Sequence, residues 1–95
     1  MLFDGEGFLW YPEDWSEPVA EALALDSGLD SLTAVQWRVL RYLREFYLGY
    51  GRAPLNRQFA QGVGLNLLAL EGLFPGGIKH GARRLAGLPN PKTCL

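Results

Sequence analysis

One segment near the middle of the chain restricts the fold more than any other. Between Thr33 and Gly51 the apolar residues recur every three or four positions, which predicts one long helix. Thr33 and Gln36 have the spacing of a capping box at its beginning. Gly51 is a natural end for a helix, and Pro54 prevents its continuation. The apolar face is wide enough to need cover on more than one side, so we expect this helix at the centre of the fold.

Four shorter helices are predicted around the central one. The first begins at Ser16, a residue type common at helix starts, and ends at Gly28. Three more follow Pro54, over residues 56–61, 65–73 and 78–86, and Gly87 is expected to end the last of them.

The N-terminal segment predicts extended structure instead. Gly5 and Gly7 break any helix there, and residues 8–11 are rich in strand-forming side chains. A tight turn around residues 4–7 would make a short hairpin that Pro12 ends. The predicted fold is therefore α+β: a short N-terminal β-hairpin packed on an array of about five helices, followed by a Pro-rich C-terminal arm.

Composition excludes several classes of protein. Hydrophobic residues make up 48% of the 95 residues and three are Trp, which argues against intrinsic disorder. No apolar run approaches the roughly 18 residues of a membrane span, and the acidic N-terminus is unlike a secretion signal. One cysteine cannot form an internal disulfide, so we expect a reducing, cytoplasmic location and no membrane partner.

Charge is divided unevenly along the chain. Residues 1–30 carry eight acids and no Lys or Arg, whereas residues 31–95 carry nine bases and two acids. Such a division predicts either a basic face for an anionic partner or two halves that attract each other on folding. The sequence leaves both interpretations open.

The last eight residues hold the strongest candidate for chemistry. Pro89 and Pro91 disfavour a helix and favour an extended arm, and Gly87 offers a hinge. Seven residues beyond Gly87 stands Cys94, which the arm could carry roughly 20 Å from the body. We therefore divide the chain into a body, residues 1–87, and an arm, residues 88–95.

A thiol is reactive as its thiolate, so neighbouring bases matter. Lys92 on the arm, and Arg83 and Arg84 on the last helix, are expected to stabilise the thiolate of Cys94. An incidental terminal cysteine is the alternative. His80 is the one partner for a Cys–His pair, without an orienting third group, and one Cys with one His cannot supply a structural zinc site.

Several stretches of the sequence resemble the DsrC/TusE family, which comprises the gamma-subunit-like protein of dissimilatory sulfite reductase and a sulfur-relay protein of tRNA 2-thiouridine synthesis. The resemblance is carried by residues 4–9, 12–15, 36–47, 53–54, Arg57, 73–77 and 86–95. The last stretch, with cysteine as the penultimate residue, is the most specific.

The resemblance implies an α+β fold with a helix-turn-helix-like pair, and a flexible arm whose cysteine carries sulfur as a persulfide. Cys94 matches that cysteine, and Arg83 stands where two-cysteine members have a second one. The chain therefore resembles the single-cysteine, TusE-like branch. The family's extra first strand is missing, and fewer residues separate Arg57 from Leu73, which indicates an internal deletion. A family Lys aligns with His80, beside Lys79.

These observations lead to two hypotheses. The first is a sulfur carrier that takes sulfane sulfur on Cys94 from a relay donor and passes it to an acceptor protein, with an indirect link to tRNA or a role in sulfite metabolism. Its support residues would be Arg57, Lys79, His80, Arg83, Arg84 and Lys92, with no cofactor and no metal. The second is a non-catalytic protein: either a regulator that binds nucleic acid through its basic second half, or a docking subunit of a sulfite-reductase-like complex. We favour the carrier, which need not bind nucleic acid and is not a multi-turnover enzyme on its own.

Overall fold

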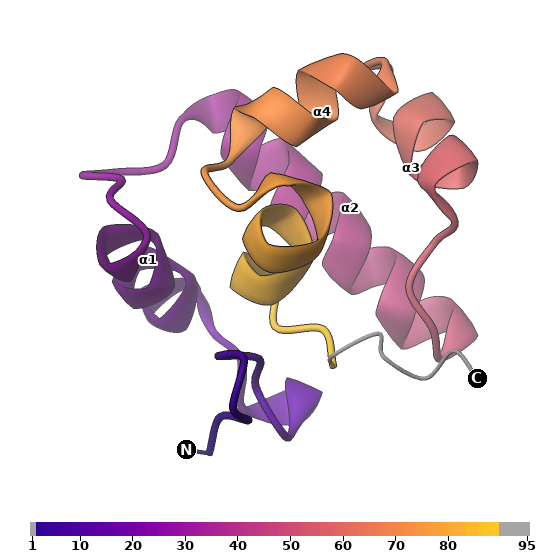
Figure 1. The fold of residues 1–95 in the computed structure, drawn as a ribbon. Coiled ribbons are helices and arrows are strands. Elements are labelled where there is room, and N and C mark those ends of the chain that lie inside the picture. Colours follow the sequence, from indigo (N-terminus) through magenta and orange to yellow (C-terminus); the bar gives the residue numbers. More distant parts are fainter. Residues whose placement is uncertain (1, 90–95) are drawn as a thin grey trace.

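A computed structural model of the chain describes residues 2–89. The elements are η1 (Pro12–Asp14), α1 (Glu17–Asp26), α2 (Ala34–Tyr50), α3 (Asn56–Val63), α4 (Leu67–Leu73) and η2 (Gly77–Arg83). Of these, η1 is a 3₁₀ helix and η2 is a π-helix. α3 and η2 both pack on α2, and α4 contacts both α3 and η2. Figure 1 shows α2 running through the middle of the molecule, with α1 on one side and α3 and α4 on the other.

The central helix forms for the reasons that the sequence predicts. Thr33 Oγ1 accepts from the amide of Gln36 at 3.1 Å, and Gln36 Oε1 accepts from the amide of Thr33 at 2.9 Å. This capping box satisfies two amides at the helix start. At the other end Gly51 has φ +75°, and its amide donates to Tyr47 O at 2.7 Å. Both predicted ends of the central helix are confirmed.

The core lies where α2 meets the other helices. α2 contributes three fully buried residues, Val39, Leu40 and Leu43. The remaining members come from every other α-helix and from the end of the described chain: Ala20, Leu23, Ala24, Phe59, Val63, Leu70, Phe74, Ile78, Ala82, Leu85, Ala86 and Leu88. One contiguous core thus joins residue 20 to residue 88.

The predicted β-hairpin, and with it the α+β class, is wrong. Residues 2–89 contain no β-strand, and Phe3 and Leu9 form only an isolated antiparallel bridge. The segment does reverse direction, because Asp4 Oδ1 accepts from the amides of Glu6 and Phe8, each at 2.9 Å. Each side of this turn is only a few residues long before the 3₁₀ helix at Pro12 begins. The described chain is therefore helical, with a short turn at its N-terminus.

The last predicted helix differs in its winding. An α-helix was expected over residues 78–86, whereas the structure has the π-helix η2 followed by a short α-helical turn at Arg84 and Leu85. Where the winding is wider, residues 74–76 lie very close to the backbone of η2. A Cβ on Gly81 would lie 2.6 Å from Phe74 Cβ, and a Cβ on Gly76 would lie 2.6 Å from the carbonyl carbon of His80. The glycines at these positions allow the chain before η2 to pack directly on it.

A matched pair of glycine substitutions tests the packing of α3 on α2. A methyl group on Gly62 would overlap the ring of Tyr42, which lies parallel to Phe59 with a centroid distance of 6.1 Å. We expect Gly62→Ala to lower the free energy of unfolding by about 1–3 kcal/mol, measured by urea denaturation. Gly72 in α4 has open space around it, so Gly72→Ala should raise that free energy by about 0.5–1 kcal/mol. Equal effects of the two substitutions would contradict this packing.

Candidate functional site

The last helical turn ends in a defined reversal. Gly87 has φ +74°, its amide donates to Arg84 O at 3.1 Å, and the amide of Leu88 donates to Arg83 O at 3.2 Å. These two bonds form a Schellman motif, in which glycine takes the left-handed position. Leu88 is then fully buried in the core, whereas Pro89 is exposed. The backbone path is thus fixed as far as Leu88.

Two side chains from distant elements bind this reversal. Trp15 Nε1, just after η1, donates to Leu85 O at 2.8 Å. Arg44 Nη1, on α2, donates to Pro12 O at 3.0 Å and to Ala86 O at 3.3 Å. The guanidinium of Arg44 also lies over the Trp15 ring, 4.7 Å from its centroid. We call Trp15, Arg44, Gly87 and Leu88 the arm root.

The arm root holds a partly buried charge. Burial lowers the pKa of Arg44 from its ordinary value, and the neighbouring Tyr47 partly opposes this shift. An arginine nevertheless stays protonated at any physiological pH. Its charge is compensated by two carbonyl oxygens and an aromatic face, which makes the contact specific for a planar guanidinium.

Gly87 belongs to the arm root because of its contact with Trp15. A Cβ on Gly87 would lie 2.8 Å from Trp15 Cβ and closer still to the indole ring. Any side chain at position 87 would therefore displace Trp15. Gly87, predicted as a hinge, is buried in this contact.

Three of the predicted support residues face the N-terminal turn. Glu6 Oε1 lies 3.0 Å from His80 Nε2 and 3.9 Å from Lys79 Nζ. The ring of His80 also makes an edge contact with Phe8, with centroids 5.6 Å apart. Arg84 Nε donates to His80 O at 2.9 Å, and its Nη2 donates to Ser27 Oγ. These residues hold the N-terminal segment and α1 against the last helix.

Arg83 faces the opposite way. Its Nη2 donates to Pro54 O at 2.9 Å and lies 3.4 Å from Asn56 Oδ1, whereas its buried Nε has no hydrogen-bond partner among the described residues. Burial lowers the pKa of Arg83 from its ordinary value. Arg57, on α3, is exposed. The structure thus does not gather the predicted bases at one place.

The remaining predicted site residues cannot be placed. Pro91, Lys92 and Cys94 lie outside the described residues. Within residues 2–89, no group of three or more His, Cys, Asp or Glu side chains is arranged to hold a metal ion. No helix in the same range is long and apolar enough to cross a membrane.

The uneven charge along the chain is partly matched within the fold. Glu17 lies 3.6 Å from Arg41, and Glu6 contacts Lys79 and His80, so each of these ion pairs joins the acidic first third to the basic remainder. Such pairs are expected if the acidic and basic parts of the chain attract each other on folding. All of them are largely exposed, so each contributes little to stability.

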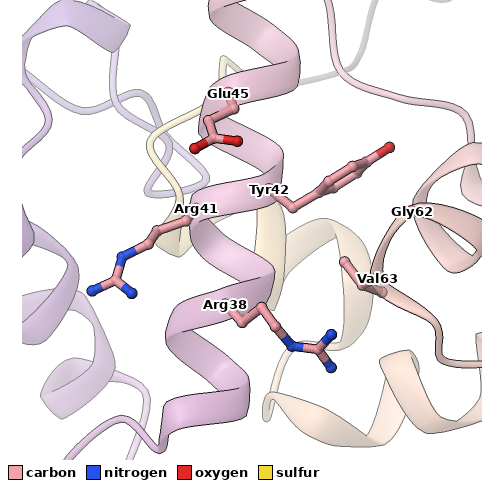
Figure 2. A pocket seen from close by; sticks show the side chains of 6 residues that line it. All are labelled: Arg38, Arg41, Tyr42, Glu45, Gly62 and Val63. Carbon is pink, nitrogen blue, oxygen red and sulfur yellow. The ribbon is translucent and has the colours of Figure 1, made fainter.

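A cavity of about 420 Å³ lies between α2 and α3. Figure 2 shows Arg38 and Tyr42 directed toward the side of Gly62 and Val63, and Arg41 and Glu45 directed away from it. The charged residues around the cavity have both signs, so it does not select a ligand by charge alone.

Trp15 and Arg44 were not predicted as site residues. Arg44 occupies a position on α2 that the apolar pattern assigns to the wetter side, and Trp15 is separated from Leu85 by 70 positions. The one local signal for this contact was Gly87, which was predicted as a helix end. A glycine has no side chain, so it leaves room for a neighbouring aromatic ring such as that of Trp15.

The comparisons with known proteins agree with this architecture. The family described as "DsrC like protein" matches residues 1–95. The chain belongs to the DsrC-like family. The TusE sulfurtransferases of Salmonella choleraesuis and Escherichia coli K12 are 36% and 35% identical to it, over 97% of this chain and 90% of theirs.

Solved structures of DsrC-like proteins have the same fold. The oxidised gamma-subunit of the dissimilatory sulfite reductase from Archaeoglobus fulgidus, DsrC, is 38% identical and superposes with a TM-score of 0.90, over 100% of this chain and 92% of that one. Dissimilatory sulfite reductase I superposes with a TM-score of 0.91 at 30% identity, over 99% of this chain and 90% of that one. The resemblance stated from the residues is confirmed.

A pair of leucine substitutions tests where the DsrC-like body ends. Leu88 is fully buried, whereas Leu68 on α4 is 84% exposed. We expect Leu88→Ala to lower the free energy of unfolding by about 2–5 kcal/mol, because it leaves a cavity in the core. Leu68→Ala should change it by less than about 0.5 kcal/mol. Urea denaturation of both variants measures this difference, and a Leu88→Ala variant as stable as Leu68→Ala would show that Leu88 is not part of the core.

Proposed function

We propose that this chain is a sulfur carrier of a sulfur-relay pathway that accepts sulfane sulfur as a persulfide on Cys94. The observation that carries the proposal is the similarity to TusE sulfurtransferases along nearly the whole chain, together with a lone cysteine in the penultimate position. The solved structures of DsrC-like proteins support the same role. Sulfur-relay donors and acceptors are the partners that this family membership implies.

The chemistry is an exchange of sulfane sulfur between thiols. The thiolate of Cys94 attacks the terminal sulfur of a donor's persulfide, the donor's sulfur–sulfur bond breaks, and the donor cysteine leaves as a thiolate. Delivery is the same step in reverse, with an acceptor's thiolate attacking the sulfur on Cys94. No net oxidation occurs, so no cofactor is required. One cysteine suffices for this role, whereas an internal disulfide would need a second.

The described body carries five of the bases that were predicted to support the thiol. Lys79, His80, Arg83 and Arg84 lie on the last helix, and Arg57 lies at the start of α3. We propose that they, with Lys92, favour approach of acidic partners and the thiolate form of Cys94. Arg83 has a buried Nε donor without a hydrogen-bond partner among the described residues. Pro89 and Pro91 are proposed to keep the arm extended beyond the arm root.

The proposal extends to the pathway that the carrier serves. The TusE-like single cysteine favours a relay toward tRNA thiolation in the cytoplasm, with tRNA reached through an acceptor protein. The alternative is a non-catalytic regulator or docking subunit, which the names of the solved relatives as subunits of dissimilatory sulfite reductase favour. A docking subunit should bind its complex with Cys94 replaced, and DNA binding by a regulator should weaken steeply with salt.

Mass spectrometry tests the carrier directly. After incubation with a cysteine desulfurase, cysteine and a relay donor protein, we expect the chain to gain the mass of one sulfur atom, removable by dithiothreitol. Cys94→Ser should abolish the gain without changing the melting temperature, because substitutions in terminal segments generally cost little stability. Peptide mapping should place the added sulfur on Cys94. An unchanged mass with a donor that loads other DsrC-like proteins would contradict the proposed function.

A further inference from the structure

An apolar hollow of about 410 Å³ lies beside helix α1, which Figure 1 shows at the periphery, away from α3. The residues that line it are all apolar: Phe3, Pro18, Val19, Ala22 and Leu23. Small-molecule sites usually include a few polar side chains that fix the orientation of the ligand, and no lining side chain here is polar. The hollow is therefore better suited to apolar side chains of another protein.

A second hollow, of about 270 Å³, lies beside the same helix. Its lining includes Glu21 and Leu25 on α1, Asp30 in the following loop and Trp37 on α2. At helical spacing, positions 21 and 25 fall on a different side of α1 from positions 19 and 23, which line the first hollow. Leu25 is 62% exposed. An apolar hollow and a hollow with two carboxylates thus lie on either side of one exposed helix.

The acids on this face are not neutralised within the described part of the chain. Glu21, Asp26 and Asp30 are exposed, and their carboxylates have no ion-pair or hydrogen-bond partner among residues 2–89. Asp26 follows Ala22 by one helical turn, so it lies at the end of the apolar hollow. The sequence contains no Lys, Arg or His before Arg38. This face therefore carries negative charge beside both hollows.

Two bases reach α1 from other elements, and both are bound to other groups. Arg41 Nη2 lies 3.6 Å from Glu17 Oε2, and its guanidinium lies 5.8 Å from the centroid of the Trp37 ring. Arg84 Nη2 donates to Ser27 Oγ. The unpaired acids thus keep their charge available to a partner.

We infer that this face of α1 binds a basic, amphipathic helical segment of another protein. Apolar side chains of the segment fill the hollow beside Ala22, and its Lys or Arg side chains reach Glu21 and Asp30. Amphipathic helices bind apolar grooves in this way, with anchor residues at helical spacing. An anionic membrane surface or a nucleic acid would be repelled by the acids, which argues against both. The inference goes beyond the proposed function and does not involve Cys94.

Two synthetic peptides of equal length test the two kinds of contact. One has leucine and lysine at helical spacing, and the other has glutamate at every lysine position. We expect the Leu/Lys peptide to shift the backbone amide NMR signals of α1 and of the loop that follows it, at peptide concentrations up to about 1 mM. The Leu/Glu peptide should leave these signals unchanged. Added sodium chloride should weaken binding of the Leu/Lys peptide, because salt screens exposed charges.

Two matched pairs of variants locate the binding face. Ala22→Arg and Leu68→Arg each add one positive charge at an exposed helical position, but only position 22 lines the hollow. Ala22→Arg should raise the Kd of the Leu/Lys peptide at least about tenfold, whereas Leu68→Arg should change it by less than about twofold. Glu21→Gln should raise the Kd by about two- to fivefold, and Glu71→Gln, on α4, should leave it unchanged.

Several outcomes would overturn the inference. They are amide shifts confined to other elements, equal binding of the two peptides, and native affinity in a folded Ala22→Arg variant. Sedimentation of the chain alone tests the remaining occupant, because a dimer that Ala22→Arg dissociates would assign this face to a second copy of the chain. None of these results depends on loading of Cys94 with sulfur, so failure of this inference and failure of the proposed function are distinguishable.

Discussion

The hydrogen bond from the Trp15 indole to Leu85 O connects the two ends of the described chain. Arg44 reinforces it from the central helix by lying on the same ring and by binding the next carbonyl, Ala86 O. The N-terminal segment is also attached by the buried side chains of Phe8 and Leu9, whereas the exposed ion pairs of Glu6 contribute little. The cluster of Trp15 and Arg44 therefore joins the segment after η1, the central helix α2 and the reversal at Gly87.

The core of this small protein extends almost to the end of the described chain. A domain of 95 residues has a modest core, and its last described core residue is Leu88, the first residue of the segment that the sequence assigned to the arm. The described body can thus be stable by itself. Family membership connects this body to sulfur relay.

The sequence predicted those features that depend on neighbouring residues. Thr33, Gln36 and Gly51 specify the central helix within their own segment, and both ends were confirmed. The β-hairpin was wrong because strand-forming residues at Phe8–Tyr11 do not make a strand without a partner of sufficient length. Arg44 was missed because helical periodicity describes one helix and not what packs on it. Cys94 was proposed as the carrier cysteine from a motif of neighbouring residues, and it stays a prediction.

Hydrogen exchange of the Trp15 indole is the measurement that tests the arm root most directly. Its N–H should exchange only when the whole protein unfolds, because it donates to Leu85 O beneath the guanidinium of Arg44. The indole of Trp10, whose residue is 58% exposed, provides an unprotected reference in the same sample. The account predicts strong protection of Trp15 relative to Trp10, and loss of much of it in Arg44→Met. Equal exchange of the two indoles in the folded native protein would contradict it.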